Sequence, residues 1–292
     1  TASNNTAVGS SALASNTTGT SSVAVGANAL GTVTTGSNNT AVGKDALKST
    51  NSSNCTAVGF AALEALVGGT DNTALGSVSL PLCSTGGYNT ALGKGTLNKL
   101  TGGAENVAVG LNALYEYLGS YNTAIGSQCL QAATTGSANT AMGRMAMSEI
   151  TTGNNNTVIG YHAMKAGNGD SNTLMGYDVG LTMTTGSSNT IIGYYTGRNL
   201  TTGSSNVMIG NNVATYVTQM TTGQRNVYIG PYVRCSSASV SDEIAIGYNL
   251  TGKGTETSFI GGTSGAYNEG NTSTFSTTSD IRIKKNITNN TT

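Results

Sequence analysis

Apolar residues recur along this chain at one fixed place in a short repeat. The repeat reads Gly-Ser-x-Asn-Thr-Ala-Φ-Gly, where Φ is a large apolar residue, and residues 136–143 are a representative copy. The closing glycines are 16 or 17 residues apart up to Gly210, and the spacing then becomes irregular. A repeat of this kind indicates a stack of similar structural units. The sixteen Φ residues are Val8, Val25, Val42, Val58, Leu75, Leu92, Val109, Ile125, Met142, Ile159, Met175, Ile192, Ile209, Ile229, Ile246 and Ile260.

A second apolar position lies four residues after the closing glycine, where ten consecutive repeats carry Leu or Met. Each repeat therefore holds two short apolar segments with a glycine-containing corner on either side, and we expect these glycines to supply the backbone angles of tight turns. Frequent glycine disfavours helices, whereas the alternation in Asn-Thr-Ala-Φ is typical of a strand. We predict an all-β fold, a β-solenoid or β-roll with about 17 residues per coil.

An asparagine precedes the predicted strand in twelve of the sixteen repeats. Equivalent residues stack in a solenoid, so these side chains are expected to form a ladder of hydrogen bonds to one another or to the turn backbone. We interpret the column as structural rather than as a binding site. Its central members are Asn122, Asn139, Asn156, Asn172 and Asn189.

Both faces of the predicted strand are apolar. The residue before Φ is alanine in the first nine repeats and then grows to Val158, Leu174, Ile191, Met208 and Tyr228. We expect Φ to fill the coil interior and the residue before it to face outward, since neighbouring strand residues point to opposite sides. Alanine on an outer face permits close approach of another chain, so the pattern predicts a homo-oligomer.

Composition and charge argue against several classes of function. Only 9% of the residues are charged and the formal net charge is zero, which does not fit a nucleic-acid-binding protein. No apolar run approaches the ~20 residues of a membrane-spanning helix, so no membrane insertion is expected. The four cysteines are scattered, and no catalytic Ser/His/Asp set, carboxylate pair or phosphate-binding loop occurs. We therefore expect no enzyme, no cofactor, no metal and no disulfide framework.

Changes in the repeat divide the chain into four segments. Regular repeats cover residues 1–212, irregular terminal coils cover 213–262, and a Gly-, Ser- and Thr-rich neck or linker covers 263–278. The sequence changes character at 279–288, which reads Ser-Asp-Ile-Arg-Ile-Lys-Lys-Asn-Ile-Thr. Because the chain opens inside a repeat, we expect a fragment or a processed product.

The Ser-Asp-Ile-Arg-Ile-Lys-Lys-Asn-Ile segment resembles the opening motif of the intramolecular chaperone domain of phage tail fibres and endosialidase-type spikes. The resemblance implies that residues 279–292 begin such a domain, which trimerises the fibre and then cleaves itself off between Ser279 and Asp280. The body of that domain does not occur within the 292 residues. The repeats also resemble tail-fibre shafts and, more distantly, the heads of trimeric autotransporter adhesins.

These observations together predict a homotrimeric structural shaft of a viral or phage fibre, at the virion surface or otherwise extracellular. Its partner would be a host cell-surface receptor, with a glycan as one candidate. A bacterial trimeric surface adhesin is the first alternative. An ice-binding solenoid is the second, because threonine pairs such as Thr134-Thr135 recur beside a corner glycine, although turn chemistry explains them more simply.

Three tyrosines add one candidate surface feature. Tyr161, Tyr177 and Tyr194 directly follow the closing glycine in three successive repeats, so they are expected to stack. Such a column can contact a glycan, because aromatic rings combine a large apolar face with a polar tip. Corner packing or a subunit contact is the simpler interpretation.

Overall fold

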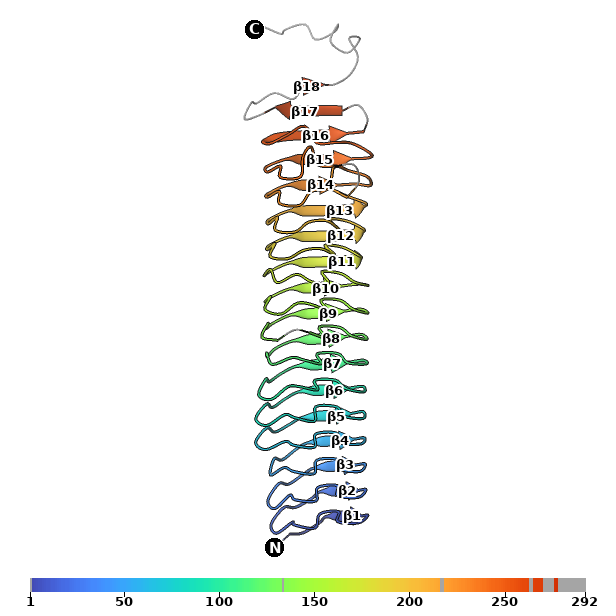
Figure 1. The fold of residues 1–292 in the computed structure, drawn as a ribbon, viewed down its shortest axis with the longest axis vertical. Coiled ribbons are helices and arrows are strands. Elements are labelled where there is room, and N and C mark those ends of the chain that lie inside the picture. The colour runs from blue at the N-terminus through green and yellow to red at the C-terminus, as the bar shows by residue number, and fades with distance from the viewer. Residues whose placement is uncertain (1, 133, 216–217, 263–264, 270–275, 278–292) are drawn as a thin grey trace, which may run out of the picture. The chain divides into compact units, whose positions relative to one another are not determined.

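The computed structural model describes residues 2–132, 134–215, 218–262, 265–269 and 276–277. These residues form short strands joined by turns, with no helix, and the first thirteen strands begin 16 or 17 residues apart (Figure 1). The predicted all-β solenoid with about 17 residues per coil is thereby confirmed. The chain divides into two units, residues 1–172 and 173–292, which are described in turn.

The first unit contains ten parallel strands, each paired with the next along the chain. Equivalent residues lie opposite one another, so that Ala124 pairs with Ala141 and Ile125 with Met142. The strands are β1 (Thr6–Val8), β2 (Val23–Val25), β3 (Thr40–Val42), β4 (Thr56–Val58), β5 (Thr73–Leu75), β6 (Thr90–Leu92), β7 (Val107–Val109), β8 (Thr123–Ile125), β9 (Thr140–Met142) and β10 (Thr157–Ile159).

Within the second unit, six strands show the same kind of parallel pairing, and the last two strands are antiparallel. β17 pairs antiparallel with β16, and β18 pairs antiparallel with β17. The strands are β11 (Thr173–Tyr177), β12 (Thr190–Tyr194), β13 (Val207–Asn211), β14 (Val227–Ile229), β15 (Ile244–Gly247), β16 (Thr257–Gly261), β17 (Gly265–Glu269) and β18 (Ser276–Thr277). The segment 213–262 thus holds β14 to β16, and the described residues of 263–278 form β17 and β18.

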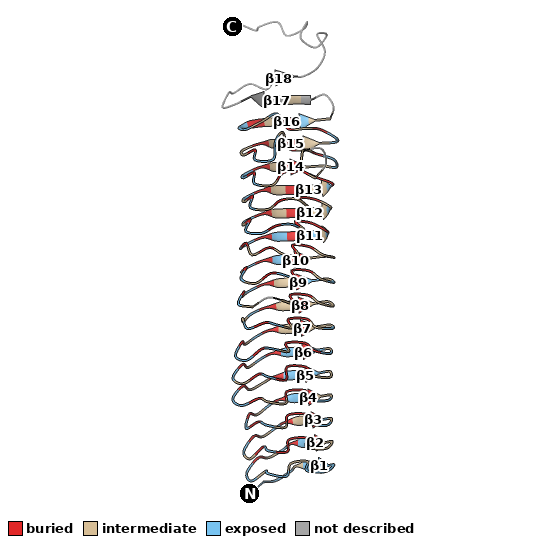
Figure 2. Ribbon diagram, in the orientation of Figure 1, coloured by how far each residue is buried: buried red, intermediate tan, exposed pale blue. Residues whose placement is uncertain are grey.

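The predicted facing of the strand is wrong. Ala141 is fully buried, whereas Met142, which we expected in the interior, is 37% exposed. The same pattern, in which the second strand residue is buried between two more exposed ones, repeats from β2 to β14 (Figure 2). The reason is the buried Asn139, because a side chain three strand positions before Met142 must point to the opposite face.

In the first unit the interior is filled from the side of the coil opposite the strand. The large residue four positions after the closing glycine, such as Leu130 or Met147, is fully buried and occupies the space left by the alanine. The first two coils of the second unit exchange these sizes, and Leu174 on β11 is accompanied by Gly180 at the opposite position. A Cβ on Gly180 would lie 2.5 Å from Leu174 Cδ2. The interior therefore has room for a large side chain at only one of these two positions.

The two corner glycines are required for different reasons. Gly26 closes its repeat with φ +134°, and a Cβ there would lie 2.6 Å from the carbonyl group of Gly43 in the next coil. Gly153, at the second corner, is not among the glycines with positive φ, so the turn angle expected there is absent. Its Cβ would instead lie 2.8 Å from the carbonyl oxygen of Gly169. Close stacking of coils therefore explains the second glycine.

Candidate functional site

The asparagine column lies inside the coils and is hydrogen-bonded in three ways. Asn139 donates from Nδ2 to Asn122 Oδ1 at 3.2 Å and to the carbonyl oxygen of Gly153 at 2.8 Å. Its own Oδ1 accepts bonds from the backbone N–H and the Nδ2 of Asn156, at 3.0 and 3.1 Å. Asn172 donates to Asn156 in the same way, at 2.9 and 3.1 Å. These buried amides bind one another and the turns, which leaves them no access to a ligand.

The column in the second unit ends in a carboxylate. Asn206 donates to Asn189 and Asn226 donates to Asn206, each at 3.0 Å from Nδ2 to Oδ1. Glu243 takes the next place and is fully buried. It accepts hydrogen bonds from the Tyr228 hydroxyl at 2.7 Å and from the backbone N–H groups of residues 236 and 254 at 3.1 and 2.7 Å. These donors stabilise a buried acidic group without a cation.

The outward face of the parallel sheet carries two columns of side chains. The first strand residue, usually threonine, and the Φ residue both point away from the interior. Leu75 is 46% exposed and Leu92 is 42% exposed, although both are large aliphatic side chains. We call these two columns the Thr–Φ face. It offers apolar contact area and hydroxyl groups, and no chemistry beyond binding.

The threonine pairs beside the second corner are engaged in the turns. Thr134 Oγ1 donates to the carbonyl oxygen of Thr151 at 3.1 Å, and Thr184 Oγ1 donates to that of Thr201, also at 3.1 Å. These bonds join one coil to the next and occupy the hydroxyl hydrogen of the first threonine in each pair. Turn chemistry therefore accounts for that first threonine.

Two of the three candidate tyrosines stack on one another. The rings of Tyr177 and Tyr194 are 5.3 Å apart and inclined by 25°, and Tyr195 contacts both. Tyr161 lies in the other unit, where its hydroxyl accepts a hydrogen bond from Arg144 Nη1 at 3.1 Å. The stack of Tyr177 on Tyr194 covers one face of each ring, and Tyr195 packs against both rings, so contacts between neighbouring coils engage the two side chains.

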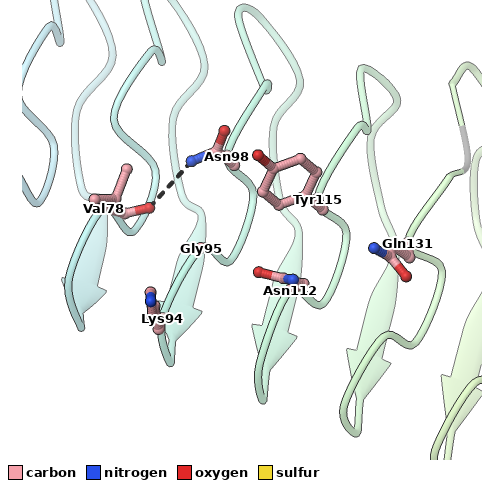
Figure 3. A pocket seen from close by; sticks show the side chains of 7 residues that line it. All are labelled: Val78, Lys94, Gly95, Asn98, Asn112, Tyr115 and Gln131. Carbon is pink, nitrogen blue, oxygen red and sulfur yellow. Dashed lines mark hydrogen bonds between the residues drawn. The ribbon is translucent and has the colours of Figure 1, made fainter.

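A groove of about 470 Å³ crosses several coils of the first unit (Figure 3). The consensus of the repeat does not predict this groove. Gly95 forms the floor of the groove. In the repeats from Gly9 to Gly247, Gly95 is the only glycine that stands two residues after the closing glycine. That exception is the sequence signal that points to this place. The groove is lined by Val78, Lys94, Gly95, Asn98, Asn112, Tyr115 and Gln131.

The remaining candidates carry no reactive site in the part of the chain that is described. All four cysteines are buried and unpaired, and burial raises the pKa of the Cys129 thiol to about 12. No group of three or more His, Cys, Asp or Glu side chains is placed to hold a metal among the described residues. The described chain also contains no helix with the length and hydropathy needed to span a membrane. The junction Ser279–Asp280 lies outside the described residues.

Comparisons of the chain with protein-family models, with curated proteins and with solved structures found no match.

Proposed function

We propose that this chain is the structural shaft of an attachment fibre, and that copies of it assemble as a homotrimer through the Thr–Φ face. The supporting observation is that Φ stays apolar in all sixteen repeats although it points outward. The position directly after the closing glycine, which is also on the outside, varies freely between Ser10, Lys44, Phe60 and Pro231. An exposed column that stays aliphatic indicates an interface.

A second copy of the same chain is the occupant that fits this face best. The column repeats at the spacing of paired strands, about 4.8 Å, and an identical chain presents the same spacing. Covering a half-exposed aliphatic side chain contributes about 1 kcal/mol, so ten such residues in the first unit contribute on the order of 10 kcal/mol before the entropic cost of association. The formal net charge of zero adds no repulsion between copies.

The fibre context rests on the resemblance of residues 279–288 to the opening of a self-cleaving chaperone domain. A shaft that trimerises with such help would function at the virion surface or elsewhere outside the cell, and would hold a receptor-binding surface away from its base. The fold is repetitive, and the side chains of its asparagine column hydrogen-bond to one another within the coils. Both features suit a structural element.

The assembly is tested by molar mass in solution, measured by light scattering after size exclusion. We expect the unmodified chain to show the mass of three copies. The double variant Leu75→Lys with Leu92→Lys places two charges in the interface and is expected to give monomers, because buried unpaired charges oppose association.

The control is Leu82→Lys, since Leu82 is 50% exposed but lies outside the Thr–Φ face. It is expected to keep the trimer. A monomeric unmodified chain at micromolar concentration, or a trimer that survives both lysines in the face, would contradict the proposal.

A further inference from the structure

We infer that the groove over Gly95 is a binding site for an acidic oligosaccharide, one that carries carboxylate groups. The inference names a ligand class for the attachment role proposed above and rests on that role for its biological meaning. Its physical basis is separate from the Thr–Φ face, and its test does not require assembly.

The groove exists because one side chain is missing from a column. Val78 and Asn112 occupy the equivalent position in the adjacent coils and share with Gly95 a φ of 54° to 66°. A Cβ on Gly95 would lie 2.5 Å from Asn112 Oδ1, so a side chain here would enter the space above the floor. Figure 3 shows the polar side chains of successive coils arranged around this floor.

The polar groups around the floor are free to bind a ligand. No hydrogen bond within the described chain engages the side chains of Asn112, Tyr115 or Gln131, and Asn98 makes one long bond of 3.4 Å to the carbonyl oxygen of Val78. In earlier coils the residues two positions after the closing glycine bind each other instead. Asn28 Nδ2 donates a hydrogen bond to Asp45 Oδ1 at 3.0 Å. The amides of the groove thus retain donors and acceptors that match sugar hydroxyls.

The charge of the groove selects an acidic ligand. Lys94 is its only cationic lining residue, is exposed, and forms no ion pair within the described residues. No carboxylate lines the groove. The nearby Lys99 is held by Glu116 at 2.7 Å, so that pair contributes little net charge. An ammonium group beside amides and one half-buried phenol ring suits a sugar with a carboxylate.

The test measures binding of a galacturonate tetrasaccharide by isothermal titration calorimetry, with neutral galactotetraose as the comparison ligand. We expect the acidic ligand to bind more tightly, and its affinity to fall as salt screens Lys94. Lys94→Gln is expected to weaken binding about tenfold, since a charge-assisted hydrogen bond is lost. Gly95→Asn fills the groove and is expected to abolish binding, and asparagine tolerates this φ, as Asn28 and Asn112 show.

The matched control is Lys44→Gln. Lys44 has the same place in its repeat as Lys94, but lies 4.0 Å from the carboxylate of Asp45 and not in the groove. Equal binding of both sugars, no binding at millimolar concentration, or unchanged binding by a folded Gly95→Asn variant would each overturn the inference. Molar mass measured on the same samples separates this result from assembly, because loss of the trimer alone would leave the groove intact.

Discussion

At the scale of single residues, the side-chain amides of the asparagine column link each coil to the next by hydrogen bonds. Asn139 uses both of its Nδ2 hydrogens and accepts two bonds at Oδ1, all in a fully buried setting. Where cysteine replaces asparagine in the column, the side chain makes longer contacts. Cys55 still donates its backbone N–H to Asn39 Oδ1 at 2.9 Å, but its thiol reaches the carbonyl oxygens of Ser53 and Gly69 only at 3.4 and 3.8 Å.

We predict that Asn139→Ala lowers the free energy of unfolding by about 3 kcal/mol, because it leaves several buried polar groups without partners. Chemical denaturation monitored by circular dichroism measures the change. Thr140→Ser, on the outward side of the same strand, is the control and should change stability by less than about 0.5 kcal/mol. Equal effects of the two substitutions would show that the column contributes little.

At the scale of one coil, the strand and the opposite corner compensate each other in volume. Alanine on β8 is accompanied by Leu130, whereas Leu174 on β11 is accompanied by Gly180 and Ile191 on β12 by Gly197. A Cβ on Gly197 would lie 3.1 Å from Ile191 Cδ1, which repeats the relation seen at Gly180. Leucine at this corner adopts a φ of about 50° in the first unit, so the backbone angle itself does not demand glycine.

This relation predicts a strong coupling between residues 174 and 180. Leu174→Ala alone should cost about 2–5 kcal/mol through the cavity it leaves, and Gly180→Leu alone about 1–3 kcal/mol through overpacking. The double variant restores the pairing of the first unit and should recover most of both losses. Unfolding free energies of the four proteins in a double-mutant cycle measure the coupling, and additive losses would contradict it.

The repeat predicts the strands and the coil length correctly, but the apolar pattern alone does not decide which face of the strand is buried. The repeat of Asn, Gly and Φ specifies the period, whereas both Ala141 and Met142 are apolar and either could fill an interior. The deciding relation was available, since Asn139 and Met142 are three residues apart and a buried ladder at one requires exposure of the other. The groove could not be predicted from the repeat, because it arises from a difference between copies, the glycine at position 95, and a consensus holds only what the copies share.

At the scale of the whole molecule, four buried thiols link stability to pH. Burial raises the pKa of Cys55, that of Cys83 to about 11, and those of Cys129 and Cys235 to about 12, all above the ordinary value of 9.0. A folded state with a raised pKa holds its proton more tightly than the unfolded chain does. The stability contributed by the neutral thiols is therefore complete below pH 9 and is lost as the pH rises toward 12.

We accordingly predict that the free energy of unfolding falls steadily between about pH 9 and pH 11, and that Cys129→Ala makes this fall less steep. The substitution is compatible with the fold because Ala113 and Ala146 occupy the same place in the two adjacent repeats and are fully buried. Urea unfolding at a series of pH values measures both slopes. Identical slopes for the two proteins would show that Cys129 does not contribute to alkaline unfolding. A shallower slope would assign part of the alkaline limit to one thiol in the interior of a coil, since the other three cysteines remain in the variant.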